Sequence, residues 1–263
     1  MTEHKIQTIF ARAEEIRNES RPAAICIVIE TQGSTPRKQG SKMIVYSDGS
    51  IFGSIGGGSV EKEVAERAVE LIASGSPEKC VFSLEQDLGM HCGGKMEVYI
   101  EPINPVQKLL IFGAGHVGRA VAKFATELDF SVTLIDPREN IFSEPGFSSY
   151  SCINRDYFEA IEQIVFNENS YSVIVTPKHL YDEDILAKIA RKPHAYIGMI
   201  GSRRKVEMLK ERFTSENILT PEELEKIDMP IGIRLRAETP QEIAICIVAG
   251  LIDVRNGLHN SNS

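Results

Sequence analysis

The pattern of apolar and polar positions changes near residue 105. Before that point, residues 5–18 and 59–73 each carry an apolar stripe at helical spacing. Apolar β-branched runs predict strands at residues 23–30, 42–46, 51–54, 80–84 and 96–100. The sequence Ser-Asp-Gly-Ser at 47–50 is a turn signal that joins two of these runs into a hairpin. Residues 1–104 therefore predict a small α+β domain.

After the segment Pro-Ile-Asn-Pro at 102–105, where we place the domain boundary, strands and helices alternate regularly. Short apolar strands are expected at 108–112, 131–135, 151–153, 172–176 and 195–200. Helical stretches are expected at 117–128, 156–166, 181–190, 202–213 and 241–255. This alternation implies right-handed crossovers and a parallel sheet with helices on both faces. Residues 105–263 therefore predict a Rossmann-like domain, and the whole chain belongs to the α/β class.

Composition excludes several classes of protein. The 263 residues are 42% hydrophobic and 25% charged, which is typical of a globular chain. The net charge of −8 argues against nucleic acid as a partner. No apolar run is long enough to span a membrane, and the N-terminus shows no secretory signal, so we expect a cytoplasmic protein. The five cysteines are widely spaced without a CxxC pair, which favours neither a disulfide framework nor a zinc knuckle.

A glycine-rich loop in the second domain could bind a nucleotide. Gly113, Gly115, His116 and Gly118 follow a predicted strand and open a helix, and Asp136 closes the next strand. In a dinucleotide fold, such glycines shape the turn and admit a diphosphate, while the acidic residue accepts hydrogen bonds from ribose. The alternative is that the glycines only shape the turn.

A second loop at the same predicted sheet edge carries Gly201, Ser202, Arg203 and Arg204, followed by Lys205. Ser202 can cap the helix, and the three cations oppose the helix dipole unless an anion lies there. A solvated basic turn is the alternative.

The first domain carries three more loops that could bind an anion or a cofactor. Gly-Gly-Gly-Ser at 56–59, with Glu61, offers a nest of backbone N–H groups but lacks the Gly-Lys ending of a P-loop. Cys92, which Gly93 and Gly94 follow, is expected to be an accessible thiol. Arg37, fixed by the turn at 33–37, could grip a phosphate or carboxylate. Each of these loops could instead be a plain surface turn.

Five segments in this order carry a resemblance to a known family: GSTPR at 33–37, GSIGGGSVE at 53–61, CGG at 92–94, GAGHVG at 113–118 and GMIGSRRK at 198–205. From about residue 10 to residue 255, the chain resembles the XdhC/CoxI family of accessory proteins for molybdenum hydroxylases. The resemblance implies a non-catalytic chaperone that binds molybdenum cofactor, holds it for sulfuration by a cysteine desulfurase, and delivers it to a xanthine-dehydrogenase-type hydroxylase.

The resemblance also implies a homodimer and makes the loop residues candidates for cofactor contact, with Cys92 touching the molybdenum or its sulfur. The expected contacts are Arg37, Gly56, Gly57, Gly58, Ser59, Glu61, Cys92, Gly93, Gly94, Gly113, Gly115, His116, Gly118, Asp136, Gly201, Ser202, Arg203 and Arg204.

Two alternatives remain open at the level of the sequence. The dinucleotide motif would also suit an NAD(P)-dependent oxidoreductase, in which His179 is the candidate proton donor because His116 lies inside the phosphate loop. It would equally suit a sensor that binds a dinucleotide and signals to a partner.

Overall fold

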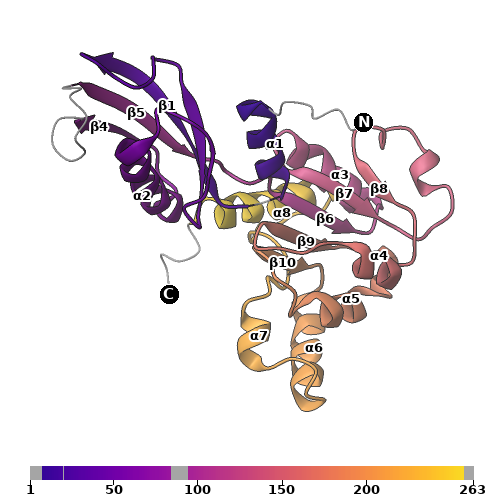
Figure 1. Cartoon of the computed structure of the whole chain (residues 1–263). Helices are drawn as coiled ribbons and strands as arrows, with labels where there is room; N and C mark the ends of the chain where they lie inside the picture. Colours follow the sequence, from indigo (N-terminus) through magenta and orange to yellow (C-terminus); the bar gives the residue numbers. More distant parts are fainter. Residues whose placement is uncertain (1–7, 20, 84–93, 258–263) are drawn as a thin grey trace. The chain divides into compact units, whose positions relative to one another are not determined.

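The chain forms two compact units, Met1–Val106 (unit 1) and Gln107–Ser263 (unit 2). The computed structural model describes residues 8–19, 21–83 and 94–257 (Figure 1). Within these residues, no helix is both long enough and apolar enough to cross a membrane.

Unit 1 is built on an antiparallel sheet with the strand order β3-β2-β1-β5-β4. Its elements are α1 (Ile9–Glu19), β1 (Ala23–Gln32), β2 (Lys42–Tyr46), β3 (Ile51–Gly53), α2 (Gly58–Ser74), β4 (Glu78–Ser83) and β5 (Lys95–Pro102). The β2–β3 hairpin forms at the predicted turn, where Asp48 accepts hydrogen bonds from the backbone and the side chain of Ser50.

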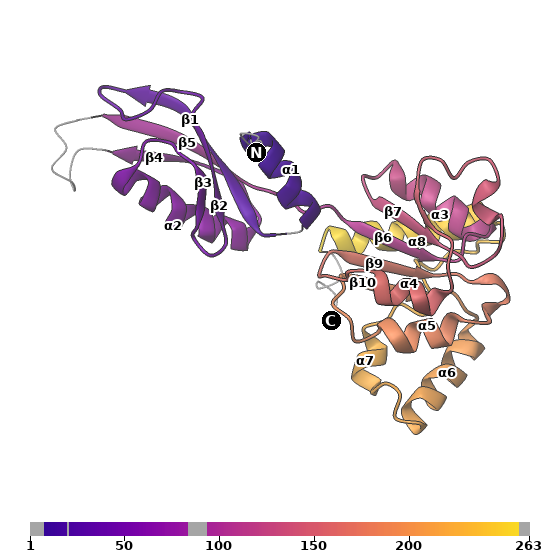
Figure 2. The same cartoon turned by 45° about the vertical axis from the view of Figure 1, so that its right-hand side comes forward.

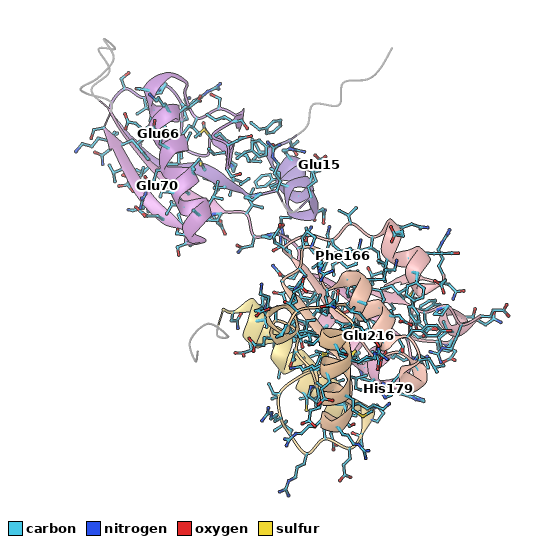
Figure 3. All side chains as sticks on the ribbon, turned by 90° about the horizontal axis from the view of Figure 1, so that it is seen from below. Glu15, Glu66, Glu70, Phe166, His179 and Glu216 are labelled. Atoms are coloured by element: carbon cyan, nitrogen blue, oxygen red, sulfur yellow. The ribbon has the colours of Figure 1, made fainter. Side chains whose placement is uncertain are left out.

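Alternation along the strands of unit 1 divides its apolar residues between two faces. Cys26 and Met43 pack with Val64 of α2, whereas Ile44 packs with Ile16 of α1. The opposite side of α2 stays polar, and Glu66 and Glu70 are exposed there (Figure 3). The two helical stripes predicted from the sequence are therefore explained by one sheet covered on both faces.

Unit 2 contains a parallel sheet with the strand order β10-β9-β6-β7-β8, which confirms the predicted Rossmann-like fold (Figure 2). Its strands are β6 (Lys108–Phe112), β7 (Ser131–Ile135), β8 (Ser151–Ile153), β9 (Ser170–Ile174) and β10 (Tyr196–Met199). The α-helices are α3 (His116–Thr126), α4 (Tyr157–Gln163), α5 (Asp182–Ile189), α6 (Arg203–Ser215), α7 (Pro221–Glu225) and α8 (Pro240–Arg255). Two short 3-10 helices, η1 (Ile141–Ser143) and η2 (Pro177–His179), complete the described part.

Helices cover both faces of this sheet, as predicted. Ile111 of β6 packs with the residues of α3 and α8, while its neighbour Phe112 packs with those of α4, α5 and α6. A strand buried on both faces reads as a continuous apolar run, which is why residues 108–112 signalled a buried strand in the sequence.

Some element boundaries differ from the sequence prediction. Strand β9 begins and ends two residues earlier than predicted, and its first residue, Ser170, is buried within the sheet despite its hydroxyl. Helix α7 was not predicted, although Thr220 and Glu223 form a capping box at its start. Leu84, the predicted end of β4, lies outside the described residues.

Candidate functional site

The strand register of unit 2 brings several candidate loops to one edge of the sheet. Phe112 is paired with Ile135 on one side and Ile174 on the other, and Ile174 is paired with Met199. These four residues end their strands in a row, so the segments that follow them leave the sheet at its carboxyl edge. The chain order reverses between β6 and β9, and ligands of open α/β sheets bind at such a switch point.

The glycines of the first loop are required by close backbone contacts. Gly113 has φ +112°, and a Cβ there would lie 2.4 Å from the carbonyl oxygen of Val175. A Cβ on Gly118 would lie 1.9 Å from the carbonyl oxygen of Gly113. The loop is therefore folded tightly against the ends of β6 and β9, with no room for side chains at these two positions.

Gly115 differs from its neighbours because it faces open space. A Cβ on this residue would meet no atom within 4 Å. Gly115 is the N-cap of α3, no side chain caps the helix, and its first turn, which begins with the exposed His116, contains no acidic residue. The first N–H groups of α3 thus form the kind of uncapped helix start that binds phosphate.

Asp136 connects the glycine loop to the following strand. Its carboxylate is fully buried and accepts hydrogen bonds from the Ala114 amide (2.8 Å) and from the Arg138 amide, Nε and guanidinium Nη2 (2.7–3.0 Å). Burial raises the pKa of Asp136, but these donors outweigh it and hold the pKa below its ordinary value. All the acceptor positions of the carboxylate are in use, so a ribose hydroxyl could bind Asp136 only by displacing one of these donors.

Tyr157 places an unpaired hydroxyl beside this region. The ring is almost completely buried, and its hydroxyl has no hydrogen-bond partner among the described residues. Burial, with the negative charges of Asp136 and Asp182, raises the pKa of Tyr157. An unsatisfied buried hydroxyl is rare in folded proteins.

The second basic loop begins α6. Ser202 caps the helix by accepting a hydrogen bond from the Lys205 amide, as the sequence predicted. Arg203 and Arg204 are exposed, and neither forms an ion pair with any residue in the described ranges. Arg203 lines a surface cavity together with residues 229–235 and Ala237.

In unit 1, segments far apart in the sequence converge. Gly56 is so close to the turn at 33–37 that a Cβ on it would lie 2.5 Å from Cγ of Pro36, beside the exposed Arg37. A Cβ on Gly94 would lie 2.3 Å from the carbonyl oxygen of Ser34. The turn that carries Arg37 therefore touches both the glycine loop at 53–61 and the residue that follows Cys92 and Gly93.

The nest of N–H groups expected at 56–59 is formed by the amides of residues 55–57, and a carboxylate of the protein itself occupies it. Oε1 of Glu61 accepts hydrogen bonds from the Ser54 hydroxyl and from the amides of Ile55, Gly56 and Gly57, at 2.7–3.1 Å. Gly58 and Ser59 then begin α2. Glu61 therefore holds the loop in shape, and its bound oxygen is not free to contact a ligand.

The predicted contact residues Cys92 and Gly93 lie outside the described residues. Of the other thiols, Cys26 and Cys246 are buried and Cys152 is exposed. Burial, the larger cause, raises the pKa of Cys26 to about 12, as expected for a core thiol. In the part of the chain that is described, no group of three or more His, Cys, Asp or Glu side chains is arranged to hold a metal ion.

Two residues at the sheet edge were not selected from the sequence. In the sequence, Tyr157 is recognisable only as part of a predicted helix, and Asp182 is recognisable only as an acidic residue in the first turn of another helix. Asp182 is buried and accepts hydrogen bonds from the amide and hydroxyl of Thr176. The available signal was its position, eight residues after Ile174, the last residue of β9 at the carboxyl edge.

Fold and loops together define a protein with an antiparallel α+β unit followed by a Rossmann unit whose carboxyl edge carries a glycine-rich loop and a basic helix start. Residues 109–251 match the model of the XdhC Rossmann domain, and residues 16–84 match that of the XdhC and CoxI family. The first match covers more than half of the chain. The chain belongs to the XdhC/CoxI family.

Three relatives extend this finding. The chain is 32% identical over 254 residues to the uncharacterized protein YqeB of Escherichia coli K12, covering 94% of this chain and 46% of that protein. It is 25% identical over 167 residues to a Bacillus subtilis 168 protein named as a probable xanthine dehydrogenase subunit, covering 63% and 48%. It is 28% identical over 107 residues to the molybdenum cofactor insertion chaperone PaoD of E. coli K12, covering 40% and 34%.

The chain thus spans about half, or less, of the length of these relatives. A crystal structure described as a xanthine dehydrogenase from Bacillus halodurans has the same fold, with a TM-score of 0.52 and 21% identity over 96% of this chain and 97% of that chain. The relatives' names refer to molybdenum cofactor and xanthine dehydrogenase, and none of these comparisons supports NAD(P) as the ligand.

Proposed function

We propose that the chain binds molybdenum cofactor, holds it for sulfuration by a cysteine desulfurase, and delivers it to a xanthine-dehydrogenase-type molybdenum hydroxylase. Membership of the XdhC/CoxI family supports a role in molybdenum cofactor maturation. A relative named as a molybdenum cofactor insertion chaperone supports the insertion step. The protein would act in the cytoplasm as a homodimer, without catalysing a reaction of its own.

The residues present fit such a cofactor, which carries a phosphate and a metal with sulfur ligands. The start of α3 offers open backbone N–H groups at Gly115 without a competing acidic side chain, which suits the phosphate. Thiolate is a soft ligand that suits molybdenum and its sulfur, and Cys92 directly precedes Gly93 and Gly94 in the sequence. When bound, the cofactor would supply the redox centre of the target hydroxylase, and this chain's part is to hold and shield it.

The observation that carries the proposal is the convergence of family segments in unit 1. The turn with Arg37 contacts both Gly56 and Gly94, although these residues lie 19 and 57 positions further along the chain. Packing alone would not require the turn with Arg37 to meet both the glycine loop and Gly94. Their meeting is what a cofactor with a negative phosphate and a thiophilic metal would need.

The test is cofactor retention by a cysteine variant. Cys92→Ala, purified anaerobically after expression with an active molybdenum cofactor pathway, should carry less pterin, measured as fluorescence after acid iodine oxidation, and less molybdenum per chain. Cys152→Ala is the matched control, because Cys152 is an exposed thiol outside the unit 1 loops. Cys26→Ala, which removes a buried thiol, should lower stability and leave retention by the folded fraction unchanged.

A second measurement follows delivery. The parent chain should activate a purified apo form of a partner hydroxylase in the presence of a cysteine desulfurase, and Cys92→Ala should fail to do so. Retention and activation by Cys92→Ala equal to those of the parent would refute the role of this thiol. Absence of pterin from the parent itself would refute the proposed function.

A further inference from the structure

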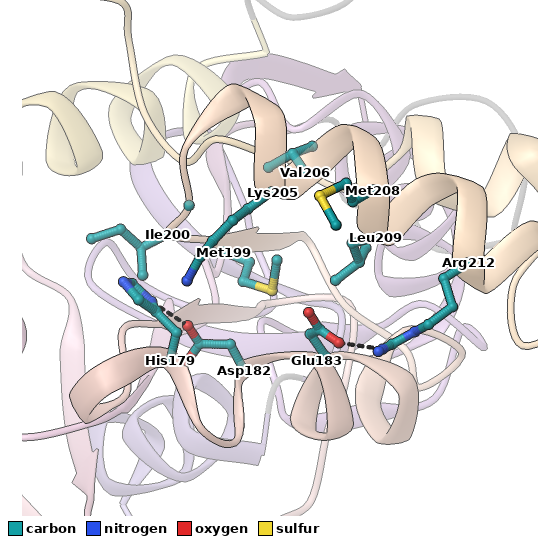
Figure 4. A pocket seen from close by; sticks show the side chains of 11 residues that line it. His179, Asp182, Glu183, Met199, Ile200, Lys205, Val206, Met208, Leu209 and Arg212 are labelled. Carbon is teal, nitrogen blue, oxygen red and sulfur yellow. Dashed lines mark hydrogen bonds and ion pairs between the residues drawn. The ribbon is translucent and has the colours of Figure 1, made fainter.

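A cavity at the carboxyl edge of unit 2 has the character of a small-molecule site, and part of its lining comes from the family segment at 198–205. It has a volume of about 370 Å³ and lies between the starts of α5 and α6, above the end of β10 (Figure 4). Met199, Val206 and Leu209 are buried and form an apolar wall, to which Met208 adds an exposed thioether. This volume falls within the range of about 300–1,000 Å³ that is typical of ligand pockets.

At one side of the cavity, His179 is held in a single orientation. Its Nδ1 lies 2.7 Å from Oδ2 of Asp182, whose other oxygen accepts hydrogen bonds from the amide and hydroxyl of Thr176. Asp182 is buried and can only accept in its charged form, so Nδ1 of His179 carries the hydrogen. In the neutral ring, Nε2 is then an acceptor, and His179 is one of the residues that line the cavity.

The backbone at His179 also sets this residue apart. Its φ is +56°, a left-handed conformation that is uncommon for a residue other than glycine. Such strain persists where the surrounding contacts fix it, and it gathers at functional sites. Here the contact with Asp182 fixes it.

Among the described residues that line the cavity, Lys205 is a cation without an ion pair. Glu183 and Arg212 form an ion pair with each other at the far end. Lys205 extends from the first turn of α6 toward His179 (Figure 4), and it has no hydrogen bond or ion pair from its ammonium group to any described residue. The ligand therefore meets an acceptor at His179, a donor at Lys205 and an apolar wall beside them.

We propose that this cavity binds the lactam edge of a flat heterocycle, as found in a pterin or in guanine. A lactam places a ring N–H donor next to a carbonyl acceptor, which matches Nε2 of His179 and the Lys205 ammonium group. The apolar wall receives the ring, and the thioethers of Met199 and Met208 make favourable contacts with aromatic faces. The inference rests on the proposed function for the source of the pterin, since molybdenum cofactor contains one.

Titration of the full chain with free pterin, guanosine monophosphate and adenosine monophosphate tests the proposal. Pterin or guanosine monophosphate should bind at least about 10-fold more tightly than N3-methylpterin and adenosine monophosphate, which lack the lactam N–H. Tighter binding of pterin than of guanosine monophosphate identifies the pterin as the ligand, and the reverse order identifies a guanine nucleotide.

Variants show whether the named residues are responsible. His179→Asn tolerates the left-handed backbone and removes the ring with its Nε2 acceptor, and Lys205→Met removes the cation while keeping the stem, so each should weaken binding of pterin about 10-fold or more. Lys210→Met, on the same helix but outside this cavity, should bind pterin as the parent does. Hydrogen exchange across α5 and α6 checks that each variant is folded.

Three results would overturn the inference: equal binding of pterin and N3-methylpterin, parental affinity in both His179→Asn and Lys205→Met, or displacement of pterin by an equal concentration of inorganic phosphate. Its failure is distinct from failure of the proposed function. If free pterin does not bind but Cys92-dependent delivery to the hydroxylase persists, the cavity assignment is wrong and the chaperone function stands.

Discussion

Replacing Glu61 with Ala should loosen the glycine-rich loop of unit 1. The Glu61 carboxylate lies at the centre of this loop, where one oxygen accepts a hydrogen bond from the Ser54 hydroxyl and three from successive backbone amides. Truncation removes this acceptor from all four donors. Because no other carboxylate of the described residues reaches these amides, the loop should lose the contact that holds it against the start of α2.

The size of the effect follows from the exposure of the donors. Ile55 is fully buried, so its amide loses a partner that water cannot replace, and an unsatisfied buried donor costs about 1–3 kcal/mol. Gly56 and Gly57 are half-buried, so water can replace part of what their amides lose. We therefore expect the free energy of opening of unit 1 to fall by about 2–4 kcal/mol, a large share of a typical domain stability of 5–15 kcal/mol.

Native-state hydrogen exchange in the whole chain can resolve this change, because it reports the free energy of opening segment by segment. Glu61→Ala should speed exchange at residues 51–74, with little effect on β6 and β7 of unit 2. Glu63→Ala is the matched control, since Glu63 lies on the same helix, is exposed, and has no hydrogen bond or ion pair with a described residue.

The pH dependence provides a second check. Partial burial raises the pKa of Glu61, but its hydrogen bonds outweigh this and hold the pKa below the ordinary value of 4.5. A carboxyl with a lowered pKa in the folded state stabilises it fully above the unfolded value and loses that contribution as the pH falls through the folded value. The difference between parent and Glu61→Ala should therefore be largest near neutral pH and shrink below pH 4.5. A change under about 0.5 kcal/mol at pH 7 would refute this account of the loop.

Three further predictions concern unit 2. Gly118→Ala should lower the stability of unit 2 by at least about 2 kcal/mol, because the new Cβ would lie 1.9 Å from the Gly113 carbonyl oxygen. Gly115 faces open space, so Gly115→Ala should change the stability by less than about 0.5 kcal/mol. Hydrogen exchange across β6 and α3 compares the two variants. Tyr157→Phe removes an unpaired buried hydroxyl and should raise the melting temperature slightly or leave it unchanged, and a marked fall would reveal a hidden partner. Asp136→Asn should lower the free energy of unfolding by about 3 kcal/mol at pH 7, measured by denaturant unfolding. This loss should shrink below the ordinary pKa of 3.8, and a loss that stayed constant in acid would contradict the role given to the charge of Asp136.

The sequence determined the architecture because both units depend on local periodicity. Residues 108–112, 131–135 and 151–153 were predicted as strands with the bounds that the structure has. Helix α8 was also predicted, because Thr239 caps its start and Pro240 occupies its first position, and both effects depend on neighbouring residues alone. The family was identifiable as well, since each of the five segments that carry the resemblance is a short continuous stretch of sequence.

Only the tertiary structure could show which groups donate hydrogen bonds to a given carboxylate. From the sequence, Glu61 and Asp136 looked like ligand contacts, because an acidic residue near a glycine loop has the same pattern whether it binds a ligand or the loop itself. Folding brings donors to both carboxylates: neighbouring amides to Glu61, and the amide of Ala114 from 22 positions away to Asp136.

The cavity beside His179 was decided by the tertiary structure for the same reason. It depends on Asp182, which turns His179, and on Lys205, which approaches from the next helix along the sheet. Hydrophobic periodicity and turn chemistry act over a few residues, so the sequence alone shows them. Whether a polar group is fully hydrogen-bonded, and whether space stays open beside it, depends on atoms from distant parts of the chain, and only the folded structure determines which atoms these are.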